Sequence, residues 1–146
     1  MIRIFGSETD LALRILMLLY VCKGTVNIDR MVSYDFITTY GRYFGMDEEN
    51  LHGDNEYSFG ELSARRKVMM GSIKYLVTND LIRAVDTDKG FAYSITERGT
   101  VVAKGMTSEY ALRYRKVMER VCSSMAGMTD KELRDRIDLQ SRNVRK

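Results

Sequence analysis

The hydrophobic pattern in the middle of the chain predicts one amphipathic helix that leads directly into a β-hairpin. Apolar side chains between residues 61 and 79 recur three or four positions apart, as on one face of a helix; they are Leu62, Met69, Ile73, Leu76 and Val77. Asn79 and Asp80 favour a turn after this helix, because their side chains compete for backbone hydrogen bonds. Two β-rich runs follow at 81–85 and 91–95, joined by a loop whose glycine suits a hairpin.

Further helices are predicted on both sides of this unit. Residues 9–23 are apolar on nearly every side, which is typical of a central core helix or of one that faces both the core and a partner. Residues 29–44 carry a wide apolar and aromatic face. The run 25–28 between them is β-like and is expected to pair with the hairpin. Three helices are predicted after the hairpin, at 97–105, at 109–125 and beyond a capping box at Thr129–Glu132. The last is too polar for a core position, so we expect it to fray or to dock on another chain.

Together these elements predict a mainly α protein with a small β-hairpin, a winged helix-turn-helix with extra C-terminal helices. We divide the chain into a winged-helix domain at 1–106 and a helical extension at 107–146. The segment 45–60 is an expanded loop inside the first domain; it is acidic and contains three glycines. Loops of this length without secondary structure are uncommon in compact domains and are usually functional, so this loop is expected to contact another molecule.

Composition places the chain among ordinary globular proteins. It has 146 residues, 45% of them hydrophobic and 29% charged, and a net charge of +3 that only weakly favours an acidic partner. Cys22 and Cys122 lie in apolar runs and are predicted to be free, buried and in a reducing compartment. The run 11–22 is too short to cross a bilayer and lacks the features of a secretory signal. We therefore expect a cytoplasmic protein without a membrane partner.

The sequence contains no recognisable catalytic or metal-binding motif. His52 is the single histidine, and no Ser, Cys or carboxylate pair stands at a spacing that suggests a triad with it. The acidic loop does not fit a calcium site, since Leu51 falls where a ligand is required. No glycine-rich phosphate loop is present. We therefore expect a protein that is not an enzyme and that needs no metal or cofactor.

A basic cluster opens the predicted central helix. In a winged helix these first turns enter the major groove, where base and phosphate contacts are made, and the hairpin tip lies near the DNA backbone. The predicted DNA-binding residues are Arg65, Arg66, Lys67, Lys74 and Lys89. Acidic residues close to the cluster and at the hairpin tip leave two alternatives open. One is a solvated basic face, and the other is a winged helix that contacts protein instead of DNA.

Five runs along the chain form a recognisable set: RILMLLYV at 14–21, IDRMVSYDFITTYG at 28–41, NLHGDNEYSFGELSARR at 50–66, FAYSITERG at 91–99 and SEYALRYRKVMERV at 108–121. Together they resemble the middle component of bacterial ABC-three-component systems, the small subunit encoded beside an SMC-like ATPase. The resemblance extends from about residue 15 to residue 121, and its most specific part is 50–66. That part is not a catalytic motif.

The resemblance implies a subunit of an antiphage or anti-plasmid complex of the Lamassu type. In such a complex an SMC-like ATPase senses foreign DNA and an effector, often a nuclease, is released. The middle component would be a non-catalytic winged-helix adaptor that bridges the ATPase to the effector, with double-stranded DNA as a further expected contact. The residues expected at the partner interface are Asp35, Phe36, Asn50, His52, Tyr57 and Phe59.

Two other functions stay open on the sequence. The first is a homodimeric winged-helix transcriptional regulator that dimerises through the helix at 109–125. The second is a small-molecule-binding enzyme subunit, which is supported only by the acidic loop and His52.

Overall fold

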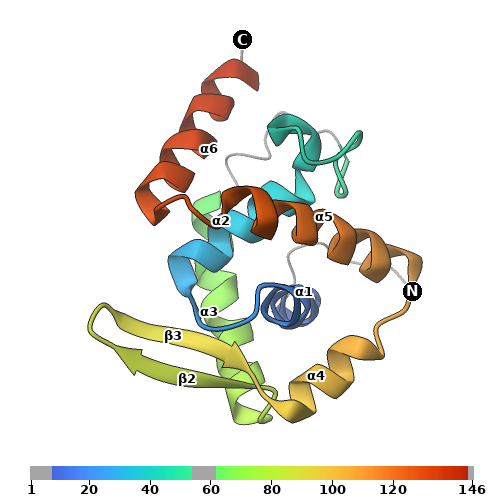
Figure 1. Ribbon diagram of the computed structural model, residues 1–146, viewed down its shortest axis with the longest axis vertical. Coiled ribbons are helices and arrows are strands. Elements are labelled where there is room, and N and C mark those ends of the chain that lie inside the picture. The colour runs from blue at the N-terminus through green and yellow to red at the C-terminus, as the bar shows by residue number, and fades with distance from the viewer. Residues whose placement is uncertain (1–7, 54–61, 145–146) are drawn as a thin grey trace.

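The computed structural model describes residues 8–53 and 62–144 (Figure 1). The helices in these ranges are α1 (Glu8–Val21), α2 (Ile28–Thr39), the 3-10 helix η1 (Gly41–Phe44), α3 (Leu62–Thr78), α4 (Glu97–Lys104), α5 (Glu109–Met125) and α6 (Asp130–Val144). The strands β1 (Val26–Asn27), β2 (Ile82–Thr87) and β3 (Gly90–Ile95) form one antiparallel sheet in the order β1-β3-β2. The prediction of a mainly helical chain with a small hairpin is confirmed.

Helix α1 is the centre of the core. It packs against α3, α5 and α4, and Figure 1 shows it end-on with these helices around it. Its buried apolar residues are Leu11, Ala12, Ile15, Leu16, Met17, Leu18 and Leu19. A helix that is apolar nearly all round can bury most of its circumference in this way, so the predicted core position is confirmed, although Leu13 is 40% exposed.

Helix α2 begins with a side-chain cap and ends earlier than its apolar pattern predicts. The side chain of Asn27 accepts a hydrogen bond from the backbone N–H of Arg30 at 2.8 Å, which satisfies a free donor of the first turn. At the other end Tyr40 leaves the helical region with φ −119° and ψ 43°, and η1 follows. The aromatic positions that suggested one long helix are thus divided between α2 and η1. The predicted pairing of the 25–28 run is confirmed, since Val26 lies opposite Tyr93 in β3.

The hairpin projects away from the helices, and its base is held against α4 (Figure 1). Its strands pair from Ile82 opposite Ile95 to Thr87 opposite Gly90. At the base, a Cβ at Gly99 of α4 would lie 2.0 Å from the carbonyl oxygen of Leu81, so this close approach requires glycine. This contact fixes the direction in which the hairpin leaves the body.

Helix α5 has the predicted bounds, but the expectation for α6 is wrong. Leu133 and Ile137 of α6 are buried in the common core, and α6 packs on α2. The predicted capping box is present: the Thr129 hydroxyl accepts from the Glu132 N–H at 3.1 Å, and the Glu132 carboxylate accepts from the Thr129 N–H at 3.0 Å. Two apolar residues four positions apart are enough to dock a polar helix. The proposed domain boundary at residue 106 stays a prediction.

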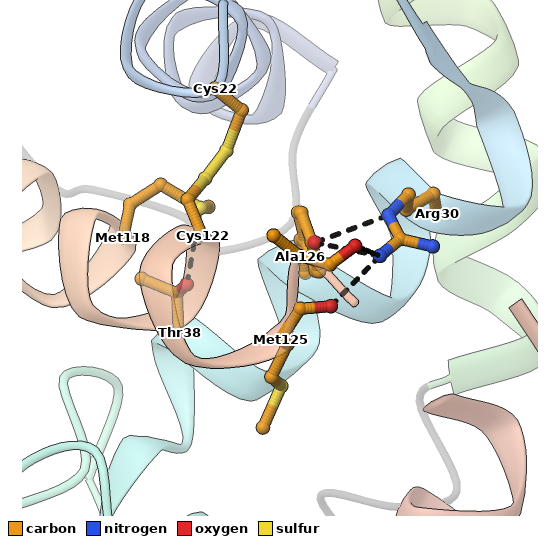
Figure 2. The surroundings of a disulfide bond; sticks show 8 residues. Cys22, Arg30, Thr38, Met118, Cys122, Met125 and Ala126 are labelled. Carbon is orange, nitrogen blue, oxygen red and sulfur yellow. Dashed lines mark hydrogen bonds between the residues drawn. A yellow bond between two sulfur atoms is a disulfide. The ribbon is translucent and has the colours of Figure 1, made fainter. Parts of the chain in front are cut away.

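A disulfide joins Cys22, directly after α1, to Cys122 in α5 (Figure 2). Their Cα atoms are 5.9 Å apart, although the residues are 100 positions apart in sequence. Both side chains are partly exposed. The prediction of two free, buried cysteines is therefore wrong. Pairing depends on the packing of α1 on α5, and that packing cannot be deduced from the local apolar pattern around each cysteine.

Arg30 of α2 lies beside this disulfide and links α2 to the end of α5. Its guanidinium donates hydrogen bonds to the carbonyl oxygens of Met125 at 2.9 Å and Ala126 at 3.4 Å (Figure 2). It also forms an ion pair with Asp130 at 2.9 Å, at the first position of α6. One cation therefore neutralises the carbonyl end of α5 and the acidic start of α6 at the same time.

Candidate interaction surface

The predicted basic cluster is split between the interior and the surface. Arg65 turns inward and is only 7% exposed. Its guanidinium donates to the carboxylate of Asp35 at 3.0 Å and to the hydroxyl of Thr39 at 3.1 Å. The prediction that Arg65 contacts DNA is wrong, because this guanidinium is buried and bound to groups on α2.

Asp35 is the centre of a buried ionic cluster. Its carboxylate accepts two hydrogen bonds from Arg14, at 2.9 and 3.1 Å, one from Arg65, and one from the hydroxyl of Tyr114 at 2.7 Å. Burial alone would raise the pKa of Asp35, but the two guanidinium groups and these hydrogen bonds outweigh it and hold that pKa well below its usual range. The cluster connects α1, α2, α3 and α5 through one carboxylate.

Three residues expected at a partner interface lie in the interior instead. Asp35 and Phe36 are fully buried, and the Arg65 guanidinium lies 5.2 Å from the centre of the Phe36 ring. Asn50 is also buried, and its side-chain oxygen accepts the backbone N–H of Arg42 at 3.0 Å. The partner contacts predicted for these three are wrong, since their side chains organise the core and the start of the acidic loop.

His52 is held on the protein body by an aromatic neighbour. Its Nε2 lies 2.7 Å from the hydroxyl of Tyr110, and the two rings stack. Burial raises the pKa of Tyr110 to about 12. His52 is partly exposed, and its contact with a partner stays a prediction. Tyr57 and Phe59, the other two predicted contacts, lie outside the described residues.

The outer face of α3 carries a stripe of exposed side chains that mixes lysine with apolar residues. Its members are spaced four, three, four and three positions apart: Ser63, Lys67, Met70, Lys74 and Val77. Met70 is 59% exposed. Val77 was expected on the buried face but is exposed, whereas Ser72 is buried. A DNA contact by Lys67 or Lys74 stays a prediction. We call these five residues the α3 stripe.

A groove of about 380 Å³ separates α3 from the hairpin. Its walls include Arg66, Met70 and Ile73 from α3 and Lys89, Phe91 and Tyr93 from the hairpin. Phe91 is 61% exposed. Arg66 forms an exposed ion pair with Asp29, and both residues line the groove. A DNA phosphate would therefore have to compete with this carboxylate for the Arg66 guanidinium. The DNA contacts predicted for Arg66 and Lys89 stay predictions.

Comparison with known proteins gives one match. The family model described as ABC-three component (ABC-3C) system Middle Component 2 matches residues 4–146. The chain belongs to this family. No curated protein and no solved structure matches it. The resemblance drawn from the sequence is thereby confirmed, and a middle component of a multi-component system implies partner proteins.

This middle component has a second exposed apolar region on another side of the molecule. A cavity of about 310 Å³ lies between α1 and the α4–α5 connection, lined by Leu13, Met17, Met106 and Ala111 together with buried polar residues. Leu13 is 40% exposed at this cavity, whereas the exposed Val101 of α4 and Leu112 of α5 are not part of its lining. In Figure 1 the α4–α5 connection lies at the right, whereas the hairpin projects to the left.

Met70, Phe91 and Arg14 were not predicted from the sequence as site residues. The spacing of four and three positions in the α3 stripe can be read from the sequence. It was not recognised as an exposed face, because all apolar positions of this helix were expected to be buried. For Arg14 the signal was a cation within an otherwise apolar helix, which implies a buried carboxylate partner. Nothing local to Phe91 distinguishes an exposed aromatic residue from a buried one.

Two further properties concern the parts of the chain that the structure describes. Within 8–53 and 62–144, no group of three or more His, Cys, Asp or Glu side chains is placed to hold a metal ion. Over the same ranges, no helix combines the length and the apolar character needed to cross a membrane.

Proposed function

We propose that this middle component is a non-catalytic winged-helix adaptor in a Lamassu-type defence complex, bridging an SMC-like ATPase to an effector subunit such as a nuclease. The family match over nearly the whole chain carries the proposal, because it assigns the chain to a system of several components. The order helix, strand, helix, helix and hairpin, with the first strand paired to the hairpin, is that of a winged helix and supports the fold assignment.

Two separate exposed apolar regions suit a bridging subunit. The first lies on the α3 stripe and the hairpin, and the second lies where α1 meets the α4–α5 connection. Contiguous apolar surface on a small protein often marks a site of protein association. Two such regions on different sides allow the subunit to hold two partners at once.

The hydrogen bonds and ion pairs of the interior polar groups favour a structural role for these groups over a catalytic one. Asp35 is the buried carboxylate that could be considered as a general base. However, it already accepts four hydrogen bonds from Arg14, Arg65 and Tyr114. Its low pKa also makes it a weak base. We therefore assign catalysis to the other subunits.

Co-expression with the neighbouring genes of its system tests the adaptor proposal. We expect tagged middle component to purify with a large ATPase and an effector subunit at defined stoichiometry. Recovery of the chain alone as a homodimer would contradict the proposal and would support the transcriptional regulator. The apolar face of α5 packs in the core through Tyr114, Val117 and Met118, so the dimer contact of a regulator would have to use the exposed and mainly polar face of this helix.

Direct DNA contact is a second candidate function, favoured by the exposed Lys67, Lys74 and Lys89. If these lysines bind phosphates, affinity for double-stranded DNA falls steeply as salt is raised, with a slope set by the number of contacts. Fluorescence anisotropy at several salt concentrations measures this slope. A slope near zero, or no binding at low salt, would rule the contact out.

A further inference from the structure

Two large apolar side chains stand exposed on opposite walls of the groove between α3 and the hairpin. Met70 comes from the α3 stripe and Phe91 from β3, and each has more than half of its surface open to solvent. The groove of about 380 Å³ that they border is large enough to take an apolar side chain from another molecule. Aromatic residues and methionine are enriched in protein interfaces, where such pockets receive the anchoring side chains.

The charged residues that line the groove are balanced, two acidic and two basic, whereas the α3 stripe beside it carries two lysines. Lys67, Lys74 and Lys89 are exposed, and none takes part in an ion pair within the described parts of the chain. The carboxylates that line the groove, Asp29 and Asp130, are paired with Arg66 and Arg30. Asp86 and Asp88 of the hairpin lie outside the lining, as Lys67 and Lys74 do. A binding segment that carries carboxylates would therefore complement the two lysines of the α3 stripe.

The spacing of the α3 stripe suits a helical partner. Positions four and three residues apart lie along one face of a helix, so Lys67, Met70, Lys74 and Val77 can contact a partner helix that lies along α3. DNA interfaces are mostly polar and cationic, so exposed Met70 and Phe91 would lie against phosphates or sugars without compensation. These two apolar residues favour protein over DNA on this face.

We infer that the α3 stripe and the adjoining groove bind an acidic amphipathic helix of another subunit, with an apolar side chain of that helix inserted between Met70 and Phe91. This inference rests on the proposed adaptor function and identifies the surface and the chemistry of one of its contacts. The lysines of the stripe pair with carboxylates on the bound helix, while Met70, Val77 and Phe91 cover its apolar face.

Site-specific cross-linking in the co-purified complex identifies what lies on this surface. A photoreactive phenylalanine analogue is placed at position 70 of the full chain, and the cross-linked peptide is identified by mass spectrometry. The expected product joins position 70 to a segment of another subunit that is rich in Asp and Glu and has helical periodicity. A cross-link to a second copy of this chain, to nucleic acid or to a segment without acidic residues would overturn the inference.

Substitutions separate the apolar and the charged contributions. We expect Met70→Ser combined with Phe91→Ser to weaken the affinity of the partner subunit by at least about tenfold, and Lys67→Glu combined with Lys74→Glu to weaken it similarly. Reversal of the acidic residues in the cross-linked segment is expected to restore binding to the lysine variant. The matched controls are Leu139→Ser, 51% exposed on α6, and the pair Lys23→Glu with Lys116→Glu, which should bind as wild type does.

The outcomes distinguish this inference from the proposed function. If wild-type protein brings down no other subunit, the adaptor proposal fails. If wild type binds its partner and both surface variants bind equally well, the adaptor proposal stands and this inference fails. If the lysine pair abolishes DNA binding while the Met70 and Phe91 substitutions change nothing, the surface is a DNA contact and the inference is overturned. Circular dichroism and thermal unfolding of each variant confirm that it is folded.

Discussion

Arg65 and Arg66 are neighbours in sequence, yet they belong to two physically different regions. The Arg65 side chain is 6% exposed and pairs with Asp35, whereas Arg66 is 47% exposed and pairs with Asp29. Successive residues on a helix point about 100° apart, so the backbone of α3 sends one arginine into the core and the other to the groove. The same chemical pairing, Arg with Asp, is therefore made once without water and once in it.

The two environments give the pairs different roles. In the interior, removal of one partner leaves a desolvated charge without compensation, so the buried cluster is sensitive to any substitution. At the surface, water solvates whichever charge is left, and the pair contributes little to stability. We infer that the buried cluster fixes how α1, α2, α3 and α5 pack, while the exposed face is free to serve binding.

The largest effect is expected from Asp35→Ala. This substitution leaves Arg14 and Arg65 buried with no carboxylate between them, apart from the contact of Arg14 with Asp10 at 3.3 Å. Breaking a buried ion pair from one side costs about 3–5 kcal/mol, a large part of the stability of a domain of this size. Urea denaturation followed by circular dichroism measures the loss. A loss below about 1 kcal/mol would show that water enters the cluster and that the two regions do not differ as described.

Acid tests the same carboxylate without changing its shape. The folded-state pKa of Asp35 lies well below the ordinary value of 3.8, so the unfolded chain takes up this proton first as pH falls. Its contribution is therefore complete above about pH 5 and declines as pH falls through the unfolded pKa, with a slope that approaches about 1.4 kcal/mol per pH unit until the folded pKa is reached. The difference in unfolding free energy between wild type and Asp35→Asn should narrow accordingly between pH 4 and pH 2. A constant difference would contradict the depressed pKa.

The disulfide adds a covalent contribution to the stability of the core, which can be compared with the contribution of the buried ionic cluster. Cys22 and Cys122 close a loop of 100 residues, and a native disulfide typically contributes about 2–4 kcal/mol, mainly through the unfolded state. We expect Cys122→Ser to lose this amount under non-reducing conditions. In dithiothreitol the variant and wild type should differ by less than about 1 kcal/mol, which serves as the control. Equal stability without reductant would mean that the bond adds nothing to the folded state.

A smaller loss is expected from Tyr114→Phe. The variant keeps the buried ring and removes the hydroxyl that donates to Asp35 at 2.7 Å. A hydrogen bond to a charged group contributes about 1.5–3 kcal/mol. Combining Tyr114→Phe with Asp35→Asn gives a double-mutant cycle in which the two losses should not add, because both residues share one hydrogen bond. Additive losses would show that the Tyr114 hydroxyl and the Asp35 carboxylate do not stabilise the fold through a shared interaction.

Local pattern predicted the elements well because each depends on nearby residues. The bounds of α5, the Thr129–Glu132 capping box and the hairpin follow from helical periodicity, capping chemistry and turn residues within a few positions. The docking of α6 was missed because it depends on two apolar positions against α2, a surface that exists only after folding.

The site was harder to predict because the charge of a side chain does not show whether that side chain points into the core or toward solvent. The run Arg65-Arg66-Lys67 suggested one basic patch, but only the helix rotation and a distant carboxylate, Asp35, decide which members reach solvent. The same holds for the cysteines, whose pairing spans most of the chain. Exposed Met70 and Phe91 were missed for the converse reason, since an apolar residue in an amphipathic pattern is normally assigned to the core.

The smallest effect is expected at the exposed pair. Asp29→Ala and Arg66→Ala should each change the free energy of unfolding by less than about 1 kcal/mol, and their double-mutant cycle should give a coupling of about 0.2–1 kcal/mol that falls as salt is added. Arg66 borders the groove, so the same two variants report on binding: losing Asp29 makes the groove more positive and should strengthen an acidic partner's affinity, whereas losing Arg66 should weaken it. Opposite effects on binding from two substitutions with nearly equal effects on stability would separate the functional face from the structural cluster. A coupling as large as that of Asp35 with Arg65 would instead mean that the groove is part of the same rigid core.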